Sequence, residues 1–162
     1  MSTADVCSRE AAWLSTSGDG LPALLAAAGG PFGVIQAYRP RTPGRRKQGQ
    51  LYVLRRTIRE TRFANQRRMA TYQLFLDIVW PMQSGSGNAE AEQQNLDDAV
   101  ELVLQRIGGF RGDKTHGGRF LSVAENPPEL SVSFHDPAPT LVSDAELRAE
   151  ITYHADDQDF TG

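Results

Sequence analysis

Apolar and polar side chains alternate most clearly between residues 70 and 80. A period of two predicts a β-strand, because successive side chains of a strand point to opposite faces of the sheet. Pro81 has no N–H to donate to a ladder, so we expect the strand to end there. The predicted strand has one fully apolar face and one mixed face. The apolar face is formed by Tyr72, Leu74, Leu76, Ile78 and Trp80, and the mixed face by Gln73, Phe75, Asp77 and Val79.

A second pattern, with helical spacing, lies between residues 89 and 107. Its apolar side chains recur every three or four positions, and its acidic side chains lie mostly off that stripe. Asn88 is a suitable N-cap, and Gly108–Gly109 is a suitable stop at the other end. The pattern therefore predicts an amphipathic helix of about five turns. The apolar stripe consists of Leu96, Val100, Val103, Leu104 and Ile107.

Shorter patterns fill the rest of the chain. A turn at 64–68 makes strand 51–63 the antiparallel partner of strand 70–80. In strand 51–63 we expect Tyr52, Leu54 and Ile58 to share one face. Helices are expected at 4–14 and 21–28, and further strands at 32–38, 119–125, 130–136 and 146–154.

These elements predict an α+β domain that spans residues 1–162. We expect a mostly antiparallel or mixed sheet, with the long helix 89–107 packed on one face and short N-terminal helices beside it. A chain of this length buries enough surface to fold without disulfides or metals. We find no hydrophobic stretch of the length that crosses a membrane, which is about 18 residues or more, and no signal peptide, so we expect synthesis and assembly in the cytoplasm.

Charge is segregated along the chain. The net charge is −3, but residues 39–68 carry +10 and the remainder carries −13. Segregation of this kind favours head-to-tail docking between copies, or binding of a polyanion. The candidate interface residues are Arg39, Arg41, Arg45, Arg46, Lys47, Arg55, Arg59, Arg62, Arg67, Arg68, Asp97, Asp98 and Glu101.

One of the charged segments lacks apolar anchors. Residues 39–50 combine basic side chains with proline and glycine, and predict an exposed loop that becomes ordered only on assembly. Residues 155–162 predict an acidic C-terminal tail. Three interpretations of the basic segment stay open: a solvated face, a partner-binding surface and a nucleic-acid-binding surface. Its few aromatic residues and the absence of a basic helix fit poorly with known modes of DNA reading.

The chemistry-bearing residues do not form a motif. Cys7 has no histidine near it in sequence to activate it as a nucleophile. Gly108–Gly109 follows the end of a predicted helix, whereas a phosphate-binding glycine loop precedes the start of a helix. His154 with Asp156 and Asp157 is the only local group with metal-ligand chemistry, and a solvated chain end is the simpler interpretation. A polar turn is likewise the simpler interpretation of His116. We therefore expect no catalytic residue, no metal and no cofactor.

The layout as a whole resembles the tail terminators of siphophages, the small proteins that end growth of the tail tube. The resemblance covers nearly the whole chain and lies in the order of its segments. The turn 115–118 and residues 134–137 are similar to those of actinobacteriophage versions. The other matching segments are the helix ending 24–29, the strand 33–40, the strand 72–79, the helix 95–104 and the final strand ending 151–154.

The resemblance implies a non-enzymatic virion protein at the head-proximal end of the tail. It implies a homo-hexameric ring that contacts the tail-tube protein on one side and a head-completion or connector protein on the other. Genomic DNA would pass through the lumen without specific binding, and no membrane would be involved. The alternatives are another head–tail connector, a tail-tube component, or a nucleic-acid-binding protein that uses residues 39–68.

Overall fold

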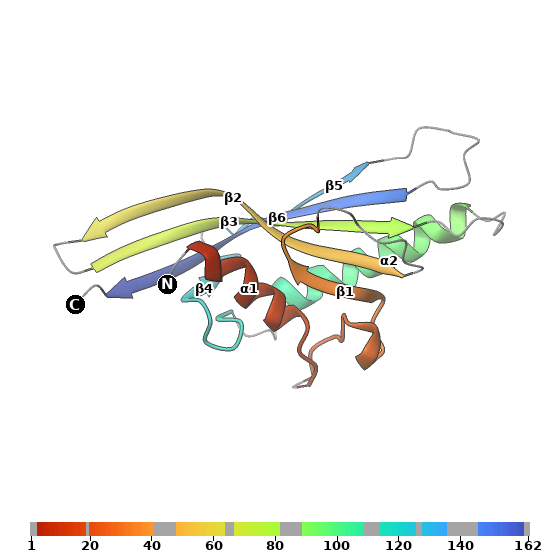
Figure 1. Cartoon of the computed structure of the whole chain (residues 1–162), viewed down its shortest axis with the longest axis horizontal. Coiled ribbons are helices and arrows are strands. Elements are labelled where there is room, and N and C mark those ends of the chain that lie inside the picture. The colour runs from red at the N-terminus through yellow and green to blue at the C-terminus, as the bar shows by residue number, and fades with distance from the viewer. Residues whose placement is uncertain are drawn as a thin grey trace.

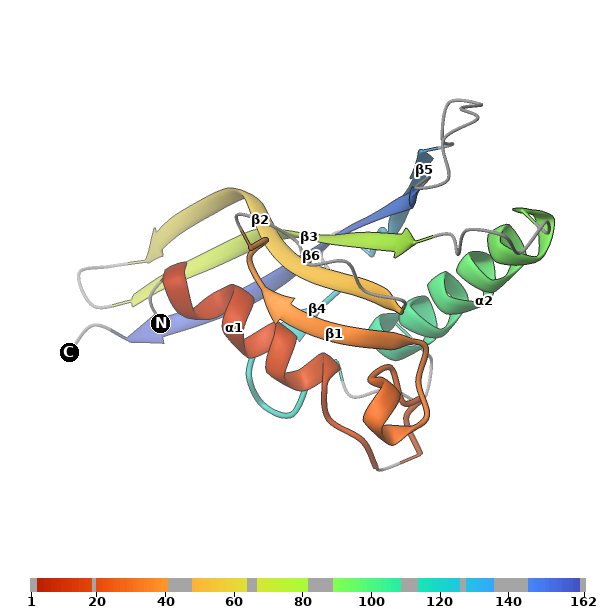
Figure 2. The same ribbon diagram turned by 45° about the vertical axis from the view of Figure 1, so that its right-hand side comes forward.

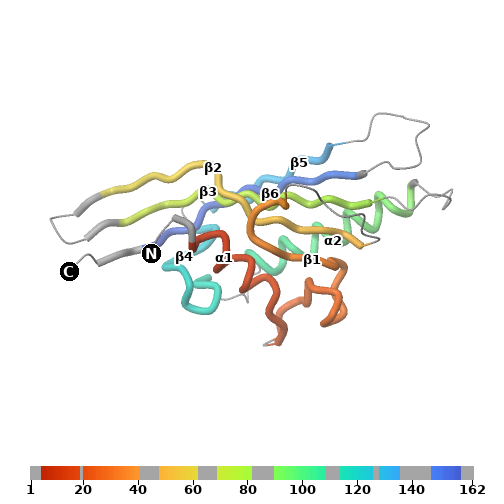
Figure 3. The backbone as a smooth tube through the Cα atoms, viewed as in Figure 1, coloured from red at the N-terminus to blue at the C-terminus, as the bar shows by residue number. Residues whose placement is uncertain are grey.

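The molecule is dominated by one curled sheet. The computed structural model describes residues 3–18, 20–40, 48–63, 67–81, 89–108, 114–125, 128–135 and 146–160. Strands account for 47% of these residues, and the sheet that they form resembles half of a barrel. Figure 1 shows the long strands of this sheet side by side along the long axis of the molecule, with the N-terminal helix below them. The course of these strands can be followed along the backbone in Figure 3.

Six strands make up the sheet. Its order is β1-β2-β3-β6-β4, and β5 also pairs with β6. Strands β1 and β2 are parallel, and all other pairs are antiparallel. The predicted antiparallel pair is confirmed, with Val53 opposite Leu76. The bounds are Phe32–Ala37 for β1, Gly49–Phe63 for β2, Arg67–Pro81 for β3, Ser122–Val123 for β4, Ser131–His135 for β5 and Glu146–Phe160 for β6.

The interior face of the sheet carries the core. The apolar parity predicted for strand 70–80 is buried on this face, except that Trp80 is only partly buried. Ile151 of β6 lies opposite Leu76 and extends the same apolar surface. Each fully buried leucine or isoleucine contributes about 1.5–3 kcal/mol of transfer free energy, so this row is a major source of stability. The row consists of Leu51, Val53, Leu74, Leu76, Ile78, Ala149, Ile151 and Tyr153.

The expected fold class, a sheet with the long helix laid on one face and short N-terminal helices beside it, is wrong. Helix α1 (Thr3–Leu14) lies along β1 and β2, whereas α2 (Ala89–Gly108) approaches the sheet chiefly at β6. Figure 2 shows α1 under the curled sheet and α2 extending away at one end. Long strands accumulate twist, so three strands of 15 residues curl and present no flat face to a long helix.

The second N-terminal helix, expected at 21–28, is also wrong. Only Ala26–Ala28 form a helical turn, of the 3₁₀ type, because Leu25 before them is extended and pairs with Phe32. The chain then turns back sharply enough that a Cβ on Gly30 would lie 2.1 Å from the carbonyl carbon of Leu24. The leucine spacing that predicted a helical face instead marks a turn that places Leu24 in the core.

A β-bulge changes the faces of β2. The register with β3 shifts between Arg55 and Ile58. Tyr52 and Leu54 lie on the outer face, opposite Asp77 and Phe75, but Ile58 lies opposite Tyr72 on the interior face. The expectation that Tyr52, Leu54 and Ile58 share a face is therefore wrong, because an extra residue in one strand inverts the alternation beyond it.

Three predicted boundaries also move. The strand expected at 119–125 is only Ser122–Val123, and residues 155–160, expected in the acidic tail, continue β6. Residues 41–47 of the expected loop 39–50 lie outside the described part of the chain. The end of that expected loop is already strand, since β2 begins at Gly49 and Gln50 is buried.

Candidate functional site

The strongest candidate for a binding surface is the exposed half of β2. We call residues 54–63 the basic arm. It lies beyond the last pairing of β1 with β2, which joins Ala37 to Val53, and it pairs on its other side with β3. Residues 55–61 are all exposed, and Ile58, whose side chain is 45% exposed, is the only large apolar residue among them. A run of exposed arginines on one part of a strand indicates a surface for a partner.

The predicted basic residues divide into four groups. Arg55 and Arg59 lie exposed on the basic arm, and the guanidinium of Arg55 sits 5.2 Å from the ring centre of Tyr38. Arg39 lies off the arm. The backbone positions of Arg62, Arg67 and Arg68 are at the tip of the β2–β3 pair, with Arg62 opposite Arg68. The fourth group lies outside the residues that the structure describes and consists of Arg41, Arg45, Arg46 and Lys47.

Arg39 is engaged within the molecule. Its Nε lies 2.7 Å from Oδ2 of Asp77, whose side chain is only 2% exposed. Burial raises the pKa of Asp77, and the positive charges of Arg39 and then Arg148 act in the opposite direction. Arg39 also lies over the ring of Phe75, at 5.9 Å. Arg39 therefore covers the mixed face of β3 and is less available to a partner than the basic arm.

Arg56 also covers the mixed face of β3, although it was not among the predicted interface residues. Its guanidinium lies 4.3 Å from the ring centre of Phe75, and its Nη2 donates to Oε2 of Glu150 at 3.2 Å. The alternation of β2 did not indicate this role, because the bulge that follows Arg55 was not visible in the sequence.

The predicted acidic residues lie elsewhere on the molecule. Asp97, Asp98 and Glu101 are all exposed on α2, on the side opposite its buried stripe. We call them, together with Glu90, the acidic helix face. Figure 1 places α2 and the free end of the basic arm at opposite ends of the long axis. The structure therefore separates the basic arm from the acidic helix face within one copy, whereas the strand register places Asp159 of β6 opposite Arg68 of β3.

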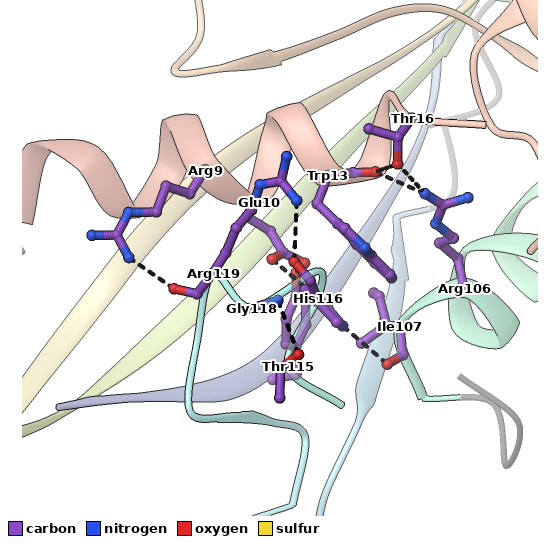
Figure 4. Close-up of polar contacts among 11 residues, drawn as sticks. Arg9, Glu10, Trp13, Thr16, Arg106, Ile107, Thr115, His116, Gly118 and Arg119 are labelled. Carbon is purple, nitrogen blue, oxygen red and sulfur yellow. Dashed lines mark hydrogen bonds and ion pairs between the residues drawn. The ribbon is translucent and has the colours of Figure 1, made fainter. Parts of the chain in front are cut away.

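A second polar group lies inside the molecule. Glu10 of α1, His116 of the loop before β4 and Tyr153 of β6 are each 0% exposed. The Nδ1 atom of His116 lies 2.9 Å from Oε2 of Glu10, and the hydroxyl of Tyr153 donates to Oε1 of Glu10 at 2.6 Å. Figure 4 shows these contacts between α1 and the loop. We call these three residues the buried cluster.

The hydrogen bonds constrain the protons of the buried cluster. Nε2 of His116 faces the carbonyl oxygen of Ile107 at 3.3 Å, and a carbonyl only accepts, so Nε2 carries a proton. Both oxygens of the Glu10 side chain are engaged, Oε1 by the hydroxyl of Tyr153 and Oε2 by Nδ1 of His116. Burial, with the charge of Glu10, raises the pKa of Tyr153 well above its usual value and keeps its hydroxyl protonated.

Aromatic stacking extends the buried cluster towards α2. The rings of Trp13 and His116 stack with centroids 3.5 Å apart. The guanidinium of Arg106 lies over the Trp13 ring, 4.4 Å from its centre. Arg106 also donates to the carbonyl oxygens of Trp13 and Pro22 and to the hydroxyl of Thr16. Helix α1 has no basic residue in its last turn, so Arg106 of α2 supplies the cation that the carbonyl end of a helix favours.

The buried cluster is structural, because none of its side chains is open to solvent. Its sequence signals were present but indirect. Glu10 follows Val6 and Cys7 at helical spacing and precedes Trp13, so it lies on the apolar stripe of α1, where a carboxylate needs a buried partner. The partner could not be identified, because His116 is 106 positions away in sequence. His116 does lie in a turn, as predicted, but its side chain is buried and contacts Glu10, which the sequence did not indicate.

The other candidate chemistry is absent from the described residues. Asp156 accepts hydrogen bonds from Thr71 and Ser122, and the described part of the chain contains no group of three or more potential metal ligands. Burial raises the pKa of the Cys7 thiol, which makes it a poor nucleophile. Among the described residues, no helix is long and apolar enough to cross a membrane.

Comparison with known proteins gives no family. Neither a protein-family model nor a curated protein matches this sequence.

Proposed function

We propose that the chain is a non-enzymatic virion structural protein that caps the tail tube of a siphophage as a ring. In this role it ends tail growth and forms the joint to the head-completion proteins. The resemblance in segment order supports this proposal. It is an argument from analogy, so the proposal must also be supported by surfaces of the molecule itself.

The observation that carries the proposal is the separation of charge between the two ends of an elongated subunit. The exposed basic arm lies at one end, and the acidic helix face at the other. Unlike surfaces on one chain favour a head-to-tail contact, and repetition of such a contact gives a ring when the rotation closes. The same surfaces serve contacts with the tail tube or a connector above it.

The small free energy of each ion pair explains why many pairs are needed. One exposed ion pair is worth about 0–1 kcal/mol, so a single arginine cannot hold a subunit in place. A ring repeats every contact at each interface, and the sum sets the register and the choice of partner. We therefore expect charge reversal at several positions to be required for a clear defect.

The rival function is direct nucleic-acid binding by residues 39–68, which the exposed arginines of the basic arm also favour. The two functions differ in what charge reversal does. We expect Arg55→Glu combined with Arg59→Glu to abolish tail joining and to leave a weak DNA affinity unchanged. The matched control, Arg55→Lys with Arg59→Lys, keeps the charges and should join tails normally.

DNA binding by the wild-type chain decides between the functions. Tight binding to duplex DNA at physiological salt, with a steep salt dependence that the glutamate variant removes, would refute the structural proposal. Another head–tail connector or a tail-tube component is the remaining alternative, and it would assemble without ending the growth of purified tail tubes.

A further inference from the structure

The basic arm belongs to a three-stranded ribbon with two unpaired edges. Within the described residues, no strand pairs with β2 beyond Val53 on the side away from β3. On the other side of the ribbon, β5 pairs with β6 only up to Thr152, and β4 pairs only with Ala155 and Asp156. Among the described residues, no strand pairs with residues 158–160 of β6 on that side either. Open edges are templates for pairing with another chain.

We propose that these two edges join neighbouring copies of this chain, with β6 of one copy adding beside β2 of the next. The inference rests on the ring of the proposed function and names the contact that builds it. Strands β2 and β6 both run antiparallel to β3, so they run in the same direction. A rotation about an axis along the strands keeps that direction, and the new pair is then parallel. Each added copy presents the same open β2 edge, so the contact repeats.

The charges of the two edges are complementary. Beyond Leu54, β2 contributes Arg55, Arg56, Arg59 and Arg62 against Glu60, whereas the open end of β6 contributes Asp157 and Asp159. Complementary charge selects the β6 edge of a second copy over another β2 edge, because like charges directly opposite one another destabilise a strand pair.

The register within one copy points to the same partner. Arg62 lies opposite Arg68, and Arg68 lies opposite Asp159, so one row across the ribbon reads basic, basic, acidic. Strand β6 thus supplies an acidic neighbour to β3, and β2 receives none on its open side among the described residues. A β6 strand from a second copy would place an acidic position next to Arg62 along this row.

The stagger between copies decides which aspartate takes this place. If the copies are not shifted along the strands, Asp159 of the next copy lies beside Arg62, which is favourable. In the same arrangement Asp157 of the next copy lies beside Glu60, which places two acidic residues together. A shift of two residues keeps every side chain on its own face. It brings Asp157 of the neighbour beside Arg62 and away from Glu60, so we expect either this shift or the unshifted row.

Cysteine cross-linking tests the contact in the full chain. Gln158→Cys is combined with Thr61→Cys for the unshifted row or with Phe63→Cys for the shifted one. The native Cys7 is fully buried and does not interfere. An internal bridge is excluded, because β3 separates β2 from β6 and holds their backbones about 10 Å apart. Oxidation should therefore give covalent multimers larger than dimers, in the presence or absence of purified tail tubes.

The controls separate failure of the edge contact from failure of the ring. Gln158→Cys alone can give dimers at most, and Gln158→Cys with Ser133→Cys, which lies on the exposed β5, should give no ladder. If both test pairs stop at dimers although the wild-type chain has the mass of an oligomer, the edge contact is wrong and the ring survives. If the wild-type chain is monomeric with and without tail tubes, the proposed function fails together with the edge contact.

Discussion

Single residues hold α1 to the sheet and α2 to α1 through buried polar contacts. Glu10 accepts from Tyr153 of β6 and contacts His116, while Arg106 of α2 binds the carbonyl end of α1. Removing one partner from such a network leaves a buried charge or acceptor without compensation, which costs more than the bond itself contributes. The buried cluster therefore fixes how α1 sits under the curled sheet.

Tyr153→Phe tests this role. The change removes the hydroxyl that donates to Oε1 of Glu10 and preserves the ring, so we expect a loss of about 1–3 kcal/mol in the free energy of unfolding. The control is Tyr52→Phe, whose hydroxyl donates to the neutral Gln50, and it should cost less. Urea denaturation measures both. Equal losses in the two variants would show that the charge of Glu10 plays no special part.

Asp77 gives the fold a pH dependence. Burial raises its pKa in the folded state, so the folded chain favours the protonated carboxyl. Stability from this group is therefore greatest below about pH 4, the usual aspartate value, and is lost as the pH rises through the raised pKa. Relative to Asp77→Asn, the wild-type chain should become less stable across that window and then level off. Urea midpoints over a pH series test this, and a difference that grows in favour of the wild type would contradict it.

At the scale of elements, the sequence predicted the existence of the long strands and of both α-helices better than their arrangement. The period of two fixed the apolar face of β3, and the apolar stripe of α2 is buried at Leu96, Val100 and Val103. The bulge after Arg55, the curl of the sheet and the turn at 21–28 were missed, because each depends on contacts between distant segments. Of the candidate site, the exposure of Arg55 and Arg59 was foreseeable, and the covering role of Arg56 was not.

The start of β2 illustrates such a contact. A Cβ on Gly49 would lie 2.5 Å from two ring carbons of Trp80, which packs edge-on against Phe32 at a centroid distance of 6.0 Å. Gly49→Ala must displace this ring, and we expect it to cost about 1–3 kcal/mol of stability. Thr61→Ala, on the exposed part of the same strand, should change stability by no more than about 0.5 kcal/mol. Chemical denaturation compares the two, and an unchanged midpoint for Gly49→Ala would show that the Trp80 ring is not fixed there.

At the scale of the whole molecule, the proposed ring requires that copies of the chain associate with one another. The subunit is elongated, carries the basic arm at one end and the acidic helix face on α2 away from it, and leaves two strand edges of its ribbon without a partner strand within the described residues. Open strand edges and unbalanced surface charge both favour association with another chain, so these features have no evident role in an isolated subunit. The proposed contact between the β2 and β6 edges would pair both open edges and place acidic positions of one copy beside the basic arm of the next.

The most direct test of this account is the mass of the wild-type chain in solution, measured by light scattering or native mass spectrometry with and without purified tail tubes. The account predicts a closed species of six copies of the 17.8 kDa chain, either alone or on the tube ends, which then grow no further. A chain that stays monomeric at all concentrations, and that leaves the tubes free to elongate, would contradict it.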